Sequence, residues 1–201
     1  MPHADSALVP ESIKTKSEFW EHIFIQLQGL LEGQRHWVSN TANASSIIYN
    51  SLLSFPKFFG RDDKAVNWCG FYIDSKFFPS PQYEGAILAD DSNRLLLGPF
   101  CGKPACQFIP TAPGKARGVC SAAFVQKATV IVPDVDSYPG HIACDGETKS
   151  EIVVPLIHEV DGEVEVLGVL DLDCLAPNGF DEDDKAGLEK IAKLIVDSCN
   201  W

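Results

Sequence analysis

The sequence predicts an α+β fold in which five or six strands form one antiparallel sheet that helices cover. Three observations lead to this prediction. Apolar residues recur at helical spacing near both ends of the chain, a β-branched and aromatic run lies near residue 70, and two long apolar runs between 151 and 172 are separated by a short polar turn. With 201 residues and 45% hydrophobic content, we expect a single domain over residues 16–201, preceded by an extension over 1–15.

Two helices are expected before the first strand. Thr15 and Glu18 fit a capping box, in which each side chain satisfies a backbone N–H of the first helical turn, so a helix is predicted to begin near Lys16. The run 38–53 again favours a helix, because its apolar residues form one stripe. Pro56 then prevents the helix from continuing.

The segment 66–73, VNWCGFYI, predicts a strand whose side chains alternate between two faces. A long excursion over 74–93 separates it from a second strand over 95–100. Strict alternation assigns Trp68, Gly70 and Tyr72 to one face and Asn67, Cys69 and Phe71 to the other.

The second half of the chain predicts a long hairpin and a closing helix. The runs 151–157 and 163–172 are joined by a turn at Asp161 and Gly162, and Asp181 is suited to cap an amphipathic helix with a stripe of Leu188, Ile191, Ile195 and Cys199. Shorter elements are expected before the hairpin: strands over 107–109 and 129–132, with a helix over 119–126 between them.

Charge and composition exclude several classes of partner. Sixteen basic and twenty-eight acidic residues give a net charge of −12, which repels nucleic acid and anionic membrane surfaces. No run approaches the roughly 20 apolar residues that a membrane span needs, and the N-terminus does not look like a signal peptide. We therefore expect a soluble protein of the cytoplasm, with the nucleus left open, whose seven cysteines are mostly thiols.

Two carboxylates end the last apolar strand. Asp171 and Asp173 lie two residues apart and therefore point to the same face, and Glu151 opens the neighbouring run. Because like charges held close together cannot both ionise cheaply, one acid of the pair is expected to have a raised pKa and to serve as a proton donor. The alternative is an ordinary strand end that is exposed to water.

Trp68 and Tyr72 face the same way on their strand, with Gly70 between them. Two aromatic faces suit a cation or a polarisable sulfur and methyl group, and the missing side chain of Gly70 would leave room for such a ligand. Ordinary core packing of the two aromatics is the alternative.

Three cysteines, Cys106, Cys120 and Cys144, lie in a polar third of the chain. Cys144 has His141 three residues before it, and a protonated histidine would stabilise a thiolate, although a solvated loop histidine fits as well. Zinc is the competing use of these groups, but no CxxC pair is present in the spacing, so we expect no metal.

Several segments, in this order, resemble the free methionine-(R)-sulfoxide reductases, which are enzymatic GAF domains: NWCGFY, LLLGPFCGKPAC, GVCSAA, YPGHIACDGETKSEIVVP and GVLDLD. The resemblance runs from about residue 16 to the C-terminus. It implies a GAF domain, a central antiparallel sheet of about six strands with helices on both faces, and a homodimer. It also implies redox cysteines at Cys106, Cys120 and Cys144, and a substrate pocket made by Trp68, Tyr72, Glu151, Asp171 and Asp173.

The implied reaction converts free methionine-(R)-sulfoxide to methionine through a cysteine sulfenic acid and an intramolecular disulfide. Thioredoxin, kept reduced by NADPH through thioredoxin reductase, would reduce that disulfide, so no bound cofactor is expected. We assign Cys144 as the attacking thiol and Cys106 or Cys120 as the resolving thiol. Cys120, at the start of a predicted helix, remains an alternative nucleophile, since a helix N-terminus lowers a thiol pKa.

Cys101 stands where the resembled family usually has glutamine, so it is a possible competitor for Cys106. Most GAF domains are sensors that bind a small molecule without chemistry, and the fold alone does not distinguish a sensor from a reductase.

Overall fold

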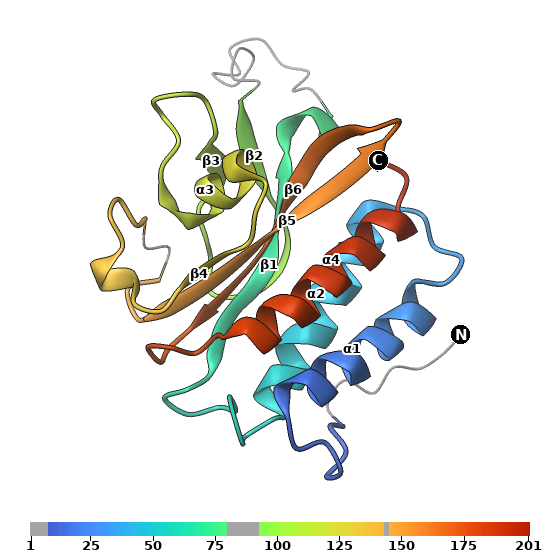
Figure 1. Ribbon diagram of the computed structural model, residues 1–201, viewed down its shortest axis with the longest axis vertical. Helices are drawn as coiled ribbons and strands as arrows, with labels where there is room; N and C mark the ends of the chain where they lie inside the picture. The colour runs from blue at the N-terminus through green and yellow to red at the C-terminus, as the bar shows by residue number, and fades with distance from the viewer. Residues whose placement is uncertain (1–7, 80–92, 143–144) are drawn as a thin grey trace.

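The computed structural model describes residues 8–79, 93–142 and 145–201. Its centre is a six-stranded antiparallel sheet with the strand order β3-β2-β1-β6-β5-β4 (Figure 1). In chain order the elements are α1 (Lys16–Leu31), α2 (Trp37–Leu53), β1 (Val66–Asp74), η1 (Ser75–Phe77), β2 (Arg94–Gly102), β3 (Phe108–Pro110), α3 (Gly118–Gln126), β4 (Val130–Val132), η2 (Val135–Ser137), β5 (Ser150–Val160), β6 (Glu163–Cys174) and α4 (Glu182–Ser198).

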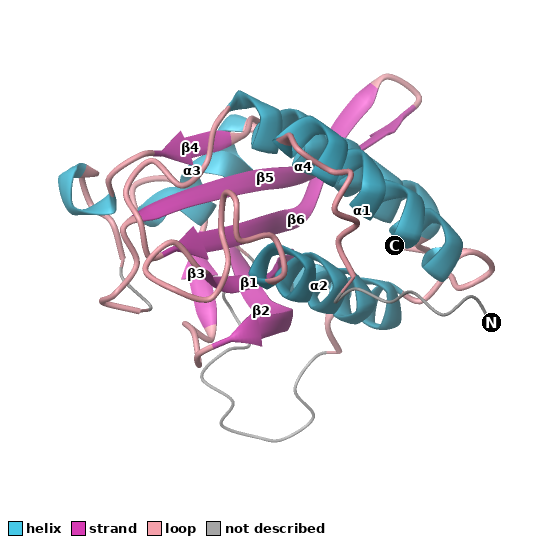
Figure 2. Cartoon of the chain, turned by 90° about the horizontal axis from the view of Figure 1, so that it is seen from below, coloured by secondary structure: helices cyan, strands magenta, loops and turns pink. Residues whose placement is uncertain are grey.

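The predicted α+β fold is confirmed, and helices lie on both faces of the sheet. The helices α1, α2 and α4 gather on one face, whereas α3 covers part of the other (Figures 1 and 2). The larger apolar core lies under the three long helices and a smaller one under α3. Among the described helices, none is long and apolar enough to cross a bilayer.

The predicted helix starts and hairpin are confirmed. Thr15 Oγ1 accepts a hydrogen bond from the Glu18 N–H at 3.2 Å, and Glu18 Oε2 accepts one from the Thr15 N–H at 3.0 Å, so α1 begins with the expected capping box. Asp181 caps α4 in the same way. The β5–β6 turn places Asp161 and Gly162 at φ values of 53° and 82°, the left-handed conformation that two-residue hairpin turns require. Of the excursion predicted over 74–93, residues 80–92 lie outside the described residues.

The predicted two-faced pattern of β1 is correct after its first residues. Trp68 and Tyr72 belong to the core under α3, whereas Cys69 and Phe71 belong to the core under the long helices. Val66, however, lies on the same side as Cys69, because the register with β6 shifts between Val66 and Trp68.

The register shift also corrects the predicted position of Asn67. Its side chain donates to Asp145 Oδ2 at 3.1 Å and to Thr148 Oγ1 at 3.0 Å, so it does not share the face of Cys69. A β-bulge adds one residue to a strand and changes which way the neighbouring side chains point, and this is the physical reason for the error.

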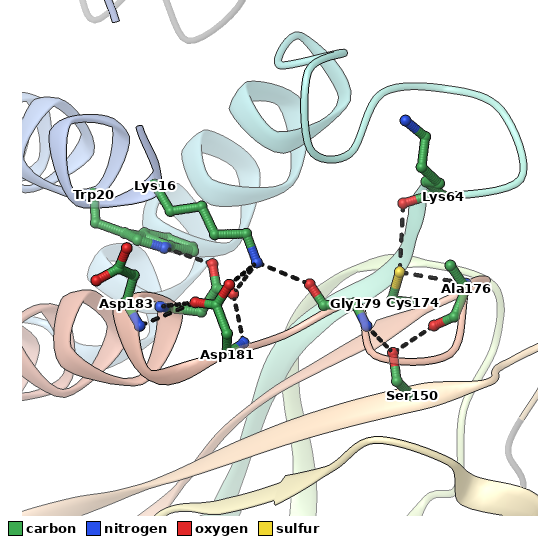
Figure 3. Close-up of polar contacts among 10 residues, drawn as sticks. Lys16, Trp20, Lys64, Ser150, Cys174, Ala176, Gly179, Asp181 and Asp183 are labelled. Carbon is green, nitrogen blue, oxygen red and sulfur yellow. Dashed lines mark hydrogen bonds and ion pairs between the residues drawn. The ribbon is translucent and has the colours of Figure 1, made fainter. Parts of the chain in front are cut away.

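A buried ion pair fastens α1 to α4 (Figure 3). Lys16 Nζ lies 2.5 Å from Asp184 Oδ2 and 2.9 Å from Asp181 Oδ2, and Trp20 Nε1 donates to Asp184 Oδ1 at 2.9 Å. The Lys16 ammonium also donates to the Gly179 carbonyl at 3.1 Å. These contacts fix the loop that follows β6. Strand β6 carries two of the predicted site residues, Asp171 and Asp173.

The same loop is tied to the start of β5. Ser150 Oγ donates to the Ala176 carbonyl at 2.6 Å and accepts from the Gly179 N–H at 3.1 Å (Figure 3). Cys174, at the end of β6, is buried and donates to the Lys64 carbonyl at 3.4 Å. Ser150 immediately precedes Glu151, so this network holds the β5 backbone where the site begins.

Candidate active site

A pocket opens on the α3 face of the sheet. Side chains from β1, β5, β6 and the first turn of α3 line it, together with the segments around residues 106–110 and 141–148. Seven of the eight residues predicted from the sequence lie in the described part of the chain, and six of them line this pocket: Tyr72, Cys106, Cys120, Glu151, Asp171 and Asp173. Cys144 lies outside the described residues.

Three carboxylates share the floor of the pocket. Glu151 on β5 lies directly opposite Asp173 on β6, and Asp171 lies two residues before Asp173 on the same face. Glu151 and Asp171 are only 5% and 6% exposed, so the alternative of a strand end exposed to water is wrong for Asp171, whereas Asp173 is partly exposed. Burial first, and then the neighbouring carboxylates, raise the pKa of both Asp171 and Asp173 well above the usual range, whereas a raised pKa was expected for only one acid of the pair.

Glu151 has a pKa raised to about 7, mainly by burial and further by the charge of Asp173. His141 opposes this shift, because its Nε2 lies 3.2 Å from Glu151 Oε2. His141, predicted as a helper of Cys144, therefore has a carboxylate partner. A group with a pKa near 7 is present in both protonation states at neutral pH, as a proton donor should be.

The thiol of Cys120 joins the carboxylates. Its Sγ donates to Asp171 Oδ2 at 3.2 Å and lies 4.0 Å from Glu151 Oε1. Burial and these acids raise the pKa of Cys120 well above that of an ordinary thiol. The expectation that the start of a helix lowers this pKa is therefore wrong, because desolvation and two neighbouring carboxylates outweigh the helix dipole.

The aromatic wall is present, although it is built differently from the prediction. The Trp68 ring stacks on Phe100 and on Tyr72, with centroid distances of 5.4 Å and 5.8 Å. Gly70 does not leave room for a ligand, because a Cβ there would lie 2.3 Å from Phe100 Cβ and 2.6 Å from the Trp68 ring. Tyr72 donates from its hydroxyl to the Cys106 carbonyl at 3.0 Å, which connects the wall to the segment that carries Cys106.

Among the predicted site residues that the structure describes, two buried polar atoms have no hydrogen-bond partner: Trp68 Nε1, a donor, and Asp171 Oδ1. Unsatisfied buried polar atoms are costly and uncommon in folded proteins. A polar ligand that bonds to either atom would remove part of that cost, so the pocket is suited to a small molecule with both donors and acceptors.

One polar network beside the pocket was missed from the sequence. Asp145 and Thr148, which line the pocket, are held by Asn67, and Lys103 Nζ lies 3.1 Å from Asp145 Oδ2. Burial opposes these contacts, but the hydrogen bonds and the lysine charge leave the pKa of Asp145 lowered. The position of Asp145 next to Cys144 in the sequence could have indicated that Asp145 lies at the site. The bulge that turns Asn67 toward Asp145 could not be predicted from the sequence.

The pocket also offers three metal-type ligands in one place. Single atoms of Cys120, Glu151 and Asp171 lie within 4.8 Å of one another. The zinc site considered from the sequence used cysteines and a histidine, whereas this trio includes two carboxylates. Glu151 and Asp171 come from β5 and β6, which lie far from Cys120 along the chain.

Comparison with known proteins assigns the family. The profile of the GAF domain family matches residues 81–197. The free methionine-R-sulfoxide reductase of Saccharomyces cerevisiae is 46% identical over 98% of this chain and 94% of its own, and that of Escherichia coli is 32% identical over 90% and 88%. The chain belongs to the free methionine-R-sulfoxide reductase family of GAF domains.

Solved structures agree with this assignment. The free methionine-R-sulfoxide reductase of Neisseria meningitidis, determined in complex with its substrate, superposes with a TM-score of 0.73 at 31% identity and covers 96% of this chain and 95% of its own. The free methionine-R-sulfoxide reductase family is a family of oxidoreductases, so the resemblance read from the sequence is confirmed.

Proposed function

We propose that this protein reduces free methionine-R-sulfoxide to methionine. The observation that carries the proposal is the pocket itself, where a buried thiol, two buried carboxylates and the partly exposed Asp173 meet the ring of Tyr72, on which Trp68 stacks. Membership of the free methionine-R-sulfoxide reductase family supports it, as does the relative whose structure contains its substrate.

In the proposed first step, the Cys144 thiolate attacks the sulfoxide sulfur while the sulfoxide oxygen takes a proton from the acid cluster. The oxygen passes to the cysteine, which becomes a sulfenic acid, and methionine leaves in reduced form. Glu151 is suited to donate, because its pKa of about 7 keeps part of it protonated at neutral pH. We assign Trp68 and Tyr72 to the methyl-thio end of the substrate, as the wall against which it packs.

In the second step, another thiol condenses with the sulfenic acid, which forms a disulfide and releases water. Cys120 and Cys106 both line the pocket and are the candidates for this resolving role. Cys120 is less suited to attack first, because burial and acidic neighbours keep its thiol protonated. The disulfide is then reduced by thioredoxin, which thioredoxin reductase keeps reduced with electrons from NADPH.

The acids also favour the free amino acid. A free methionine sulfoxide has an ammonium group, which an ionised carboxylate among Glu151, Asp171 and Asp173 would pair with. A methionine residue within a polypeptide has no such group. We further propose that the protein acts as a homodimer in the cytoplasm, with residues 16–201 as one domain.

The test is NADPH consumption with free methionine-R-sulfoxide, thioredoxin and thioredoxin reductase. We expect turnover by the wild type, none by Cys144→Ser, and turnover by the control Cys174→Ser, whose thiol is buried outside the pocket. Folding of each variant is checked by circular dichroism. Repeated turnover by Cys144→Ser would move the attacking role to Cys120, and a folded wild type that binds the amino acid without turnover would instead be a sensor.

A further inference from the structure

A second pair of thiols lies in the sheet outside the pocket. Cys69 on β1 and Cys101 on β2 are direct partners in the antiparallel register. Directly opposite residues of antiparallel strands have their Cα atoms about 4.5 or 5.5 Å apart, and their side chains point to the same face. Disulfides form at Cα separations of about 4.4 to 6.8 Å, so both kinds of cross-strand position fall within the required range.

The two thiols point away from the pocket, toward α2. Cys69 belongs to the core under the long helices, and the pKa of Tyr49 on α2 is raised by burial and then by its proximity to Cys101 and Cys69. Phe100, the residue before Cys101, stacks on Trp68 on the opposite face. The sheet therefore separates this pair from Cys120, so Cys101 is poorly placed to compete for the thiols of the pocket.

We propose that Cys69 and Cys101 form a reversible cross-strand disulfide, a redox modification site separate from the catalytic thiols. A hydroperoxide is the oxidant. Cys101, which is partly exposed, is oxidised to a sulfenic acid as the peroxide O–O bond breaks and one water or alcohol leaves. The buried Cys69 thiol then attacks that sulfur, the S–S bond forms, and the hydroxyl leaves as water.

The surroundings of the pair make this oxidation slow. Burial raises the pKa of both thiols, most of all that of Cys69, whose shift the neighbouring Cys101 and Asp171 increase. Because the thiolate is the reactive form, the rate of oxidation of Cys101 should increase with pH. Disulfide formation should be detectable only at high peroxide concentration. A slow reaction suits a pair that responds to sustained peroxide and not to each catalytic cycle.

The bond would join β1 to β2 covalently beside the aromatic wall. It would close a loop of about thirty residues, and the chain-entropy estimate for such a loop corresponds to a rise in Tm on the order of 10 °C for a domain of this size. The inference does not depend on the proposed reductase activity, because it uses no group of the pocket.

The experiment uses full-length protein that carries Cys106→Ser, Cys120→Ser and Cys144→Ser, treated with hydrogen peroxide. We expect a loss of two thiols, a Cys69–Cys101 cross-link in non-reducing peptide mapping, and the rise in Tm, all reversed by dithiothreitol. Adding Cys101→Ser should abolish all three changes. Mapping of the oxidised wild type for the same cross-link keeps the test valid if the triple variant folds poorly. Oxidation of Cys101 to sulfinic acid with Cys69 still a thiol, in both proteins, would overturn the inference.

Discussion

Replacing Glu151 by glutamine is expected to stabilise the protein above neutral pH while it abolishes the proposed turnover. In the unfolded chain the carboxyl of Glu151 loses its proton near its ordinary pKa of 4.5, whereas in the folded protein it keeps the proton until about pH 7. The folded state therefore binds more protons between these values, so its stability decreases as the pH rises from about 4.5 to about 7 and stays lower above that. Glutamine cannot ionise and escapes this loss.

The two pKa values give the magnitude. A folded pKa of about 7 against 4.5 corresponds to about 3 kcal/mol at pH 8, which is an upper limit because Asp171 and Asp173 share the site. For a domain of this size we expect Glu151→Gln to melt roughly 6 to 12 °C above the wild type at pH 8, with little difference near pH 4.5.

The assay is thermal unfolding of both proteins from pH 4.5 to pH 8.5, with Glu159→Gln as the control. Glu159 lies on the same strand but is exposed, so its replacement should leave Tm nearly unchanged at every pH. A difference between wild type and Glu151→Gln that is the same at pH 5 and pH 8 would refute the reasoning, because it would show that the proton on Glu151 is not the cause.

Three further predictions test other contacts of the protein. Asp171→Asn removes the charge beside Cys120 and should lower the pKa of Cys120, so the pH midpoint of its alkylation by iodoacetamide, followed by mass spectrometry, should decrease; an unchanged midpoint would contradict this. Lys16→Met leaves Asp184 buried without its cation and should cost about 3 to 5 kcal/mol in urea unfolding. The exposed control Lys193→Met should cost less than about 0.5 kcal/mol. An equal loss of unfolding free energy in both variants would show that the buried Lys16–Asp184 pair contributes no more than an exposed one. Gly70→Ala should destabilise by about 1 to 3 kcal/mol and change the near-ultraviolet circular dichroism, because the new methyl meets the Trp68–Phe100 stack; an unchanged spectrum would argue against that contact.

The sequence predicted the parts of the fold that depend on local periodicity. The hairpin, the capping box at Thr15 and the Asp181 cap are all set by residues close together along the chain, and all three are confirmed. The pairing of Asp171 with Asp173 on one face follows from strand alternation in the same way.

The rest of the site depends on pairing between distant segments. Neither the contact of His141 with Glu151 nor the acids around Cys120 can be read from spacing, so the direction of the Cys120 pKa shift was predicted wrongly. The bulge before Trp68 reversed the expected face of Asn67, and the packing of Phe100 filled the space expected above Gly70. In each case a partner from another strand decides the outcome.

The position of β6 limits how the site can respond to charge. From Gly168 to Cys174 this strand is paired with β1 on one side and β5 on the other, so this part of its backbone should be among the last in the sheet to exchange amide hydrogen for deuterium. Asp171 and Asp173 are thus anchored to a backbone that does not yield. The two carboxylates cannot move apart to reduce their mutual repulsion. The repulsion is instead relieved when a carboxylate takes up a proton or when a cationic ligand binds.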